Sequence, residues 1–217
     1  MAASTWLLSI PTTGRIMNYK MQPSFYFKIL MTVFFIAGFN TAYAEEFSYN
    51  YFEGGLNHHK DEEISAAFEL KASRDLGNQF NAVAGLSSTN FKMYSSDILV
   101  NQYAIGLGYH TALTPKLDLT TELAFLYIDA TIPSYSYSPI ISDTGAIATV
   151  GMRYKVTEQL EAHANIEFTE LDSTTSKEAT VGGLFKITDN ILGGISYKAV
   201  NREGDGFLKS SLRWQSL

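Results

Sequence analysis

The stretch LVNQYAIGLGYHTALTPKLDLTTELAFLYI, from Leu99 to Ile128, decides the fold. It has two arms on either side of a turn at residues 113–116, and in both arms bulky apolar side chains alternate with small, polar or charged ones. The bulky positions are Leu99, Tyr103, Ile105, Leu107 and Tyr109 in the first arm and Leu117, Leu119, Leu123, Phe125 and Tyr127 in the second. A period of two over about ten residues is typical of a β-strand whose two faces meet different environments.

The length of these arms favours a membrane as the apolar environment. Strands of soluble β-sandwiches are usually about five or six residues long, whereas a tilted strand needs about 9–11 residues to cross a bilayer. The apolar face would then contact lipid, and the polar face would line the inside of a barrel. A soluble β-sandwich or lipocalin-like carrier is an alternative, which we disfavour because aromatic residues and leucines would crowd its outer surface.

The first 44 residues differ in composition from the rest of the chain. They contain Arg15, Lys20 and Lys28 but no acidic residue, and an apolar run from Ile29 to Phe39 precedes the sequence Ala42-Tyr43-Ala44. These are the three parts of a secretory signal peptide, and the run is too short for a membrane helix, which needs about twenty residues. We therefore expect an N-terminal extension and signal peptide at 1–44, cleaved after Ala44, and an outer-membrane β-barrel domain at 45–217.

The composition is compatible with an exported barrel. The 217-residue chain has no cysteine and a formal net charge of −6, so we expect neither a disulfide framework nor a nucleic-acid partner. No later segment is long and apolar enough for a membrane helix. A closed barrel is the other structure that spans lipid with its backbone groups paired.

The alternation recurs along the chain and predicts an all-β, antiparallel, up-and-down transmembrane barrel. We expect ten strands, at residues 46–56, 64–74, 79–91, 98–111, 117–129, 144–155, 160–171, 178–187, 191–200 and 207–216. Four short turns (75–78, 113–116, 156–159 and 188–190) alternate with five longer connections (57–63, 92–97, 130–143, 172–177 and 201–206). This polarity is typical of bacterial outer-membrane barrels, and an even number of strands places both termini on the periplasmic side. Eight strands are the alternative.

Two local features of the strands add to this prediction. The alternation of Phe47, Tyr49 and Tyr51 breaks at Tyr51-Phe52, which predicts a β-bulge in the first strand. Aromatic residues near strand ends on the outward phase predict the two interfacial girdles of a membrane barrel. They are Tyr103, Tyr109, Tyr127, Tyr154, Phe168, Tyr197 and Trp214.

Four segments resemble a family of small bacterial outer-membrane β-barrels, which are often described only as porin-like outer-membrane proteins. They are YNYFEGG (49–55), IGLGYHTALT (105–114), VGMRYKVTEQLE (150–161) and FKITDNILGGISY (185–197). The resemblance covers essentially all of residues 45–217. It implies the fold and an outer-membrane location, and it implies no catalytic chemistry.

Charges of both signs occur on the inward phase and predict a salt-bridged interior. The candidate lumen charges are Glu69, Lys71, Glu122, Arg153, Glu167, Lys198 and Arg213, and the same phase adds Asp118, Lys155, Glu161, Lys186 and Lys209. Because an isolated buried charge is costly, opposite charges should pair across the interior. Barrels of about eight strands are just filled by side chains, so we expect a plugged or very narrow lumen. A conduit for ions or small solutes is the alternative.

The histidines offer little chemistry. His58 and His59 are adjacent on the first loop, without the spaced partners of a metal site. His163 shares the inward phase with Glu161 and Glu167, as a base and its orienter would, but no nucleophile can be placed beside it. We expect no catalytic residues, no cofactor and no metal site.

The functional prediction is therefore a non-catalytic integral protein of the Gram-negative outer membrane, with a role in envelope integrity or surface contact. A narrow porin-like channel is the alternative, and an enzyme at the barrel rim is a further one. The expected partners are outer-membrane lipid and lipopolysaccharide, the barrel assembly machinery and periplasmic chaperones, with the barrel itself a monomer.

Overall fold

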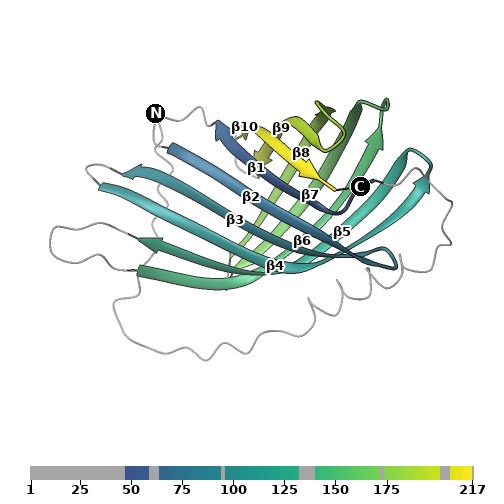
Figure 1. The fold of residues 1–217 in the computed structure, drawn as a ribbon. Helices are drawn as coiled ribbons and strands as arrows, with labels where there is room; N and C mark the ends of the chain where they lie inside the picture. Colours follow the sequence, from purple (N-terminus) through teal and green to yellow (C-terminus); the bar gives the residue numbers. More distant parts are fainter. Residues whose placement is uncertain are drawn as a thin grey trace.

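The computed structural model describes residues 47–58, 64–93, 96–131, 140–171, 174–200 and 206–216. Ten strands make up this part of the chain (Figure 1): β1 (Tyr51–His58), β2 (Ile64–Gly77), β3 (Phe80–Met93), β4 (Ser96–Thr114), β5 (Leu117–Thr131), β6 (Ile140–Lys155), β7 (Leu160–Leu171), β8 (Thr174–Lys186), β9 (Ile191–Val200) and β10 (Gly206–Gln215). Each strand pairs with its sequence neighbour, and β1 pairs antiparallel with β10 to close the barrel. The predicted ten-stranded antiparallel barrel is confirmed, and the eight-stranded alternative is wrong. The predicted signal peptide lies outside the described residues.

Among the residues that the structure describes, no helix is long and apolar enough to cross a membrane.

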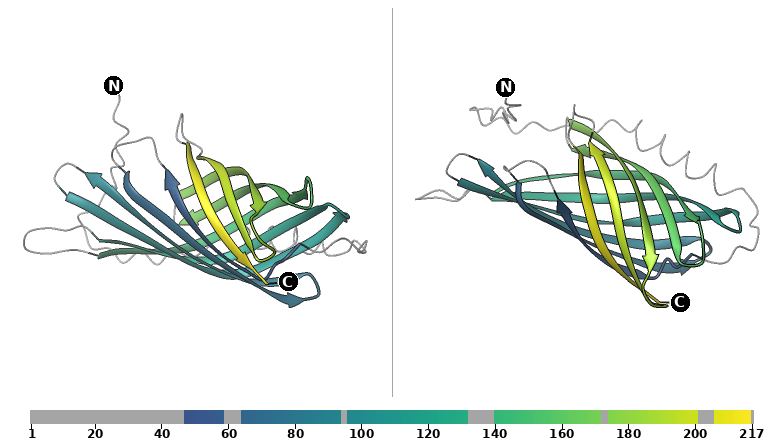
Figure 2. Two further views of the ribbon diagram at one scale, coloured as in Figure 1. Left: turned by 45° about the horizontal axis from the view of Figure 1, so that its top comes forward. Right: turned by 90° about the horizontal axis from the view of Figure 1, so that it is seen from above.

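Several strands extend further toward the loop end than predicted. Lys92 pairs with Asp97 and Met93 with Ser96, so most of the predicted connection 92–97 belongs to β3 and β4. Likewise β8 begins at Thr174, inside the predicted connection 172–177. These segments lack the apolar alternation of the other strands, yet their backbone groups continue the ladder of hydrogen bonds. The strands consequently differ in length, from 19 residues in β4 to 8 in β1, and Figure 2 shows β2–β6 reaching beyond β8–β10.

An apolar belt covers the outer face of the barrel. Ile105 is 68% exposed and Phe125 57% exposed at its middle. On β5 the belt runs from Leu117 to Tyr127, and roughly ten steps of ~3.3 Å at a tilt of ~40° give a height of about 25 Å, the height of the apolar band in outer-membrane barrels. The rings of Tyr103 and Tyr127 lie 6.1 Å apart at the loop-side edge of the belt. The belt therefore has the dimensions of a bilayer core.

Polar side chains begin directly beyond the loop-side edge of this belt. The Asn101 side-chain amide donates a 3.1 Å hydrogen bond to Asp129 Oδ2, one residue pair beyond Tyr103 and Tyr127 on the same face.

Tyr109 differs from the other predicted girdle aromatics, because it is only 5% exposed and its hydroxyl donates to Gln79 Oε1 at 2.6 Å. Its ring packs against Phe80, with the centroids 5.2 Å apart.

The first predicted strand requires correction. Residues 47–50 are not in a strand, β1 begins at Tyr51, and its pairing with β2 and β10 runs without a register shift, so the predicted bulge at Tyr51-Phe52 is wrong. Phe47, Tyr49 and Tyr51 are all buried. Their alternation continues into β1 on its inward face, because these rings pack against cations inside the barrel rather than against lipid.

Candidate functional site

The end of the barrel that carries the short turns is filled by residues 47–50, which we call the plug segment. Ser48 Oγ donates to the Ser216 carbonyl at 2.8 Å, and Ser216 N donates to the Asn50 carbonyl at 3.0 Å. Asn50 Oδ1 also accepts a 2.9 Å hydrogen bond from the backbone N–H of Asp75. The segment is thus tied to the chain after β10 and to the end of β2, and it lies across the turn-side mouth.

Arg153 on β6 is the main contact of the plug segment inside the barrel. Its guanidinium lies 4.8 Å from the ring centroid of Phe47 and 4.9 Å from that of Tyr49, and Nη1 donates to the Ser48 carbonyl at 3.1 Å. Nε and Nη2 donate to the two carboxylate oxygens of Glu161 on β7, at 2.7 and 2.9 Å. Arg153 is 8% exposed and Glu161 9% exposed. This two-point geometry is the strongest form of an ion pair between side chains.

Tyr49 is held by its ring and by its hydroxyl. The ring stacks on His110 with 3.6 Å between centroids and 12° between planes. The hydroxyl donates to Asp118 Oδ2 at 2.9 Å. Burial, more than the neighbouring charges, raises the pKa of the Tyr49 phenol above its usual value. The phenol therefore stays protonated and keeps donating to Asp118.

A second ion-pair network lies beside the plug segment on β1, β2 and β10. Arg213 Nη2 lies 2.6 Å from Glu53 Oε2, and Lys209 Nζ bridges Glu53 and Glu69 at 3.1 Å to each. The Arg213 guanidinium also lies 4.2 Å from the ring centroid of Tyr51. All these charges are therefore compensated within the barrel wall.

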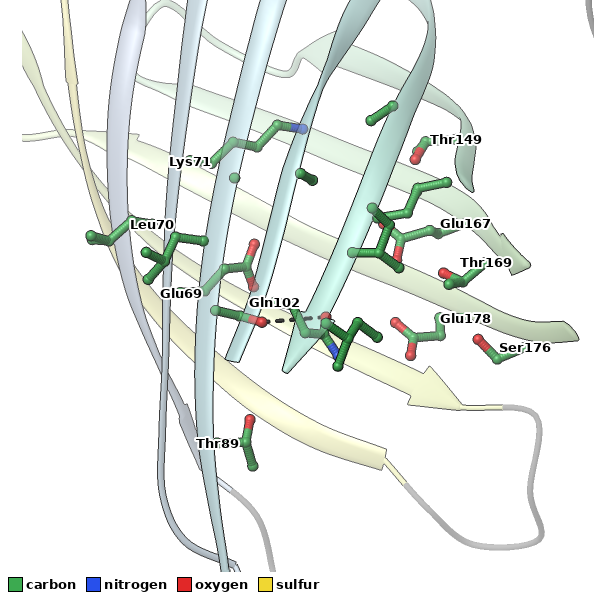
Figure 3. Close-up of a pocket in the computed structure, with 18 of the residues that line it drawn as sticks. Glu69, Leu70, Lys71, Thr89, Gln102, Thr149, Glu167, Thr169, Ser176 and Glu178 are labelled. Atoms are coloured by element: carbon green, nitrogen blue, oxygen red, sulfur yellow. Dashed lines mark hydrogen bonds between the residues drawn. The ribbon is translucent and has the colours of Figure 1, made fainter. Parts of the chain in front are cut away.

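The loop half of the barrel contains a cavity of about 380 Å³, which we call the loop-side cavity. None of its lining residues belongs to the plug segment or to the Arg153–Glu161 pair. Its charged lining residues are Glu69, Lys71, Glu122, Glu167, Glu178 and Lys198. Figure 3 shows side chains from β2, β7 and β8 converging on this space. Lys71 Nζ reaches across from β2 to Glu122 on β5, at 2.7 Å, and Lys198 on β9 pairs with Glu178 on β8.

The structure places all seven candidate lumen charges inside the barrel: Arg153 and Arg213 lie outside the cavity lining, and the other five line the loop-side cavity. Lys71 pairs with Glu122, and Arg153 pairs with Glu161. Arg213 pairs with Glu53, which sequence reasoning missed because it read Tyr51-Phe52 as a bulge. Glu69, Glu167 and Lys198 line the loop-side cavity together with Glu178. Glu178 was also missed, since it stood at the first position of its predicted strand, where no alternation yet marked its face.

The histidines do not assemble a reaction centre. His58 Nε2 lies 2.9 Å from Ser210 Oγ on the outer face, and His59 lies outside the described residues. His110 Nε2 and His163 Nδ1 are buried atoms without a hydrogen-bond partner among the described residues. The described part of the chain contains no group of three or more side chains suited to a metal ion.

No model of a protein family matches the chain, and no curated protein sequence matches it. Solved structures with a similar fold include the KdgM porin (10% identity, TM-score 0.49, covering 77% of this chain and 99% of that chain) and the NanC porin (10%, 0.48, 76% and 100%). Ail, the attachment invasion locus protein of Yersinia pestis, is similar at 14% identity, with a TM-score of 0.43 and coverage of 76% and 95%. These proteins are outer-membrane β-barrels, and the similarity is one of fold alone.

Proposed function

We propose that this chain is a non-catalytic integral outer-membrane barrel that does not conduct solutes, with a role in envelope integrity or surface contact. The observation that carries the proposal is the burial of Phe47 and Tyr49 inside the turn-side half, where both rings contact Arg153. A ten-stranded wall is only slightly wider than one that side chains fill completely, so a few inserted rings are enough to block it.

Membrane placement is supported by the apolar belt and by the polarity of the connections. Short turns typically face the periplasm and longer loops the exterior, so the plug segment would close the periplasmic mouth and the loop-side cavity would face outward. The leader would be removed after Ala44, which leaves two residues before Phe47. Outer-membrane lipid, lipopolysaccharide, the barrel assembly machinery and periplasmic chaperones are the partners that this placement requires.

Single-channel recording in planar bilayers tests the closed lumen. We expect no discrete conductance steps from the wild-type barrel, and steps from the variant Phe47→Gly/Tyr49→Gly, which removes both rings that contact Arg153. Phe52→Gly is the matched control, because Phe52 is 49% exposed on the outer face and plays no part in the plug. Wild-type steps that change with substitution of Arg153 or Glu122 would establish the narrow channel instead.

Cell fractionation tests the location. The chain should be recovered in outer membranes as a band that shifts on heating, with a mature N-terminus at Glu45. A soluble periplasmic band without a shift would contradict the membrane assignment. Hydrolysis of lipid or peptide that is lost in a folded His163→Ala variant would favour the rim enzyme.

A further inference from the structure

The loop-side cavity has two chemically different walls. Carboxylates gather on the side formed by β7 and β8, where Figure 3 shows Glu167 and Glu178 directed into the same space. The adjoining side contributes the apolar side chains of Ile128 on β5 and Ile147 on β6. Its volume, about 380 Å³, is within the range of pockets that bind small molecules, about 300–1,000 Å³. The cavity is therefore amphipathic and larger than a single ion needs.

The charges that line this cavity are unbalanced. Four are glutamates and two are lysines. Lys71 forms an ion pair with Glu122, and Lys198 forms one with Glu178. Glu69 forms an ion pair with Lys209, which does not line the cavity. Among the described residues, no hydrogen bond or ion pair reaches the Glu167 carboxylate. Glu167 is thus the one lining glutamate without a bonded cation in this part of the chain.

Glu167 lies next to a second carboxylate in the sheet. Glu167 and Glu178 are direct cross-strand partners in the β7–β8 register and face the same side. Like charges directly opposite one another are destabilising, and a carboxylate shielded inside a barrel is costly unless a cation compensates it. Lys198 attracts both groups electrostatically, but it is bonded to Glu178. The two carboxylates therefore share a single lysine.

We propose that the loop-side cavity binds a small organic cation, with its ammonium group between Glu167 and Glu178 and a short apolar body against Ile128 and Ile147. An organic ammonium fits better than a metal ion, because the described residues offer no group of three metal-ligating side chains. Thr149 and Thr169 flank Glu167 on the same inward face, where their hydroxyls can accept the remaining N–H donors. The apolar side chains select against a fully hydrated cation such as Na⁺.

Isothermal titration of the detergent-folded full chain tests this site with two probes of equal shape. Cyclohexylamine carries an ammonium group at neutral pH, and cyclohexanol is its uncharged analogue. We expect saturable binding of cyclohexylamine and at least tenfold weaker binding of cyclohexanol. Glu167→Gln should weaken cyclohexylamine binding at least tenfold, which corresponds to ~1.4 kcal/mol. Glu158→Gln, the same change on the exposed turn between β6 and β7, should leave it unchanged.

Three results would each overturn the proposal: equal binding by wild type and Glu167→Gln, equal binding of both probes, or no saturable heat at probe concentrations up to about 100 mM, where a site with a Kd of 1 mM would be filled. A heat-modifiable band for every variant shows that the barrel is folded. Because the assay uses a folded barrel in detergent and no ion current, its failure leaves the closed-barrel function intact. A conducting barrel would likewise leave the cation site intact.

Discussion

Replacement of Arg153 by methionine removes the cation that contacts both Phe47 and Tyr49 of the plug segment, and it leaves Lys155, 5.1 Å from the Phe47 ring centroid, in place. The change keeps most of the side-chain length but leaves Glu161, which is 9% exposed, as a buried carboxylate without its two-point partner. It also removes the hydrogen bond to the Ser48 carbonyl and the contacts with the rings of Phe47 and Tyr49.

The magnitude follows from these contacts. Removal of one member of a buried ion pair costs about 3–5 kcal/mol, and a cation–π contact contributes about 0.5–2 kcal/mol. Because the contacts share one guanidinium and are not additive, we expect a loss of ~5 kcal/mol in unfolding free energy for Arg153→Met. Glu161→Gln should cost ~3 kcal/mol and the double variant only ~4 kcal/mol, since the double variant contains no unpaired charge. The coupling energy of the cycle is then ~4 kcal/mol.

Urea unfolding in phospholipid vesicles, followed by tryptophan fluorescence, measures the cycle. In a chain that begins at Glu45 the only tryptophan is Trp214, which is 53% exposed on the outer face and reports on insertion into lipid. Tyr154→Phe is the control, since Tyr154 neighbours Arg153 in sequence and faces lipid at 45% exposure. A coupling energy below ~0.5 kcal/mol, the error of additivity for independent sites, would refute the role assigned to this pair.

Three further predictions concern other parts of the barrel. Because the Tyr49 pKa is raised in the folded state, only the unfolded chain loses the phenol proton near pH 10. Tyr49 should therefore lower the free energy of unfolding by up to ~1.4 kcal/mol per pH unit above pH 10. Alkaline unfolding titrations should show that Tyr49→Phe removes this dependence, which would be absent from the wild type if the phenol were solvated. A Cβ at Gly106 would collide with the Leu123 carbonyl oxygen and the Ala124 backbone, so Gly106→Ala should lower the free energy of unfolding by about 1–3 kcal/mol. Gly54→Ala is the control and should be nearly neutral, because its Cβ meets only Leu70 Cδ2, at 3.5 Å. Equal effects of the two substitutions would contradict the β4–β5 packing. Ile105→Arg, in the middle of the belt, should cost about 2–4 kcal/mol in vesicles and Ser88→Arg, beyond its edge, less than ~1 kcal/mol; the reverse order would displace the belt.

The strands and the outer belt could be predicted because one physical rule fixes them. Lipid-facing positions on β4 and β5 must be apolar and inward ones can be polar, so successive residues mark the outer and the inner face of each strand. The loop-side strand ends could not be predicted in this way. Lys92 pairs with Asp97 beyond the belt, where no lipid-facing side has to be apolar.

The plug segment was misread because aromatic alternation is ambiguous. Phe47, Tyr49 and Tyr51 have the spacing of a lipid-facing strand, and the sequence alone does not show that Arg153 and Arg213 offer their rings a cationic partner inside. One signal was available. Glu53 shares their phase, and a glutamate on the lipid face would be costly, so the whole set belongs inside. Partners such as Lys71 and Glu122 lie on strands that are not neighbours, and only the closed barrel shows which residues meet across it.

The turn half of the barrel pairs its buried glutamates with arginines, and the loop half pairs them with lysines. This difference separates the stable turn half from the half in which we propose cation binding. At the turn end, Arg153 and Arg213 make fixed, multiple contacts with Glu161 and Glu53 and with aromatic rings. A guanidinium is planar and loses little freedom per hydrogen bond, so it suits a permanent closure. The loop half uses flexible lysines, which are too few for its glutamates. An ammonium ligand can enter there without breaking an arginine pair, so that half can exchange ligands while the turn half stays closed.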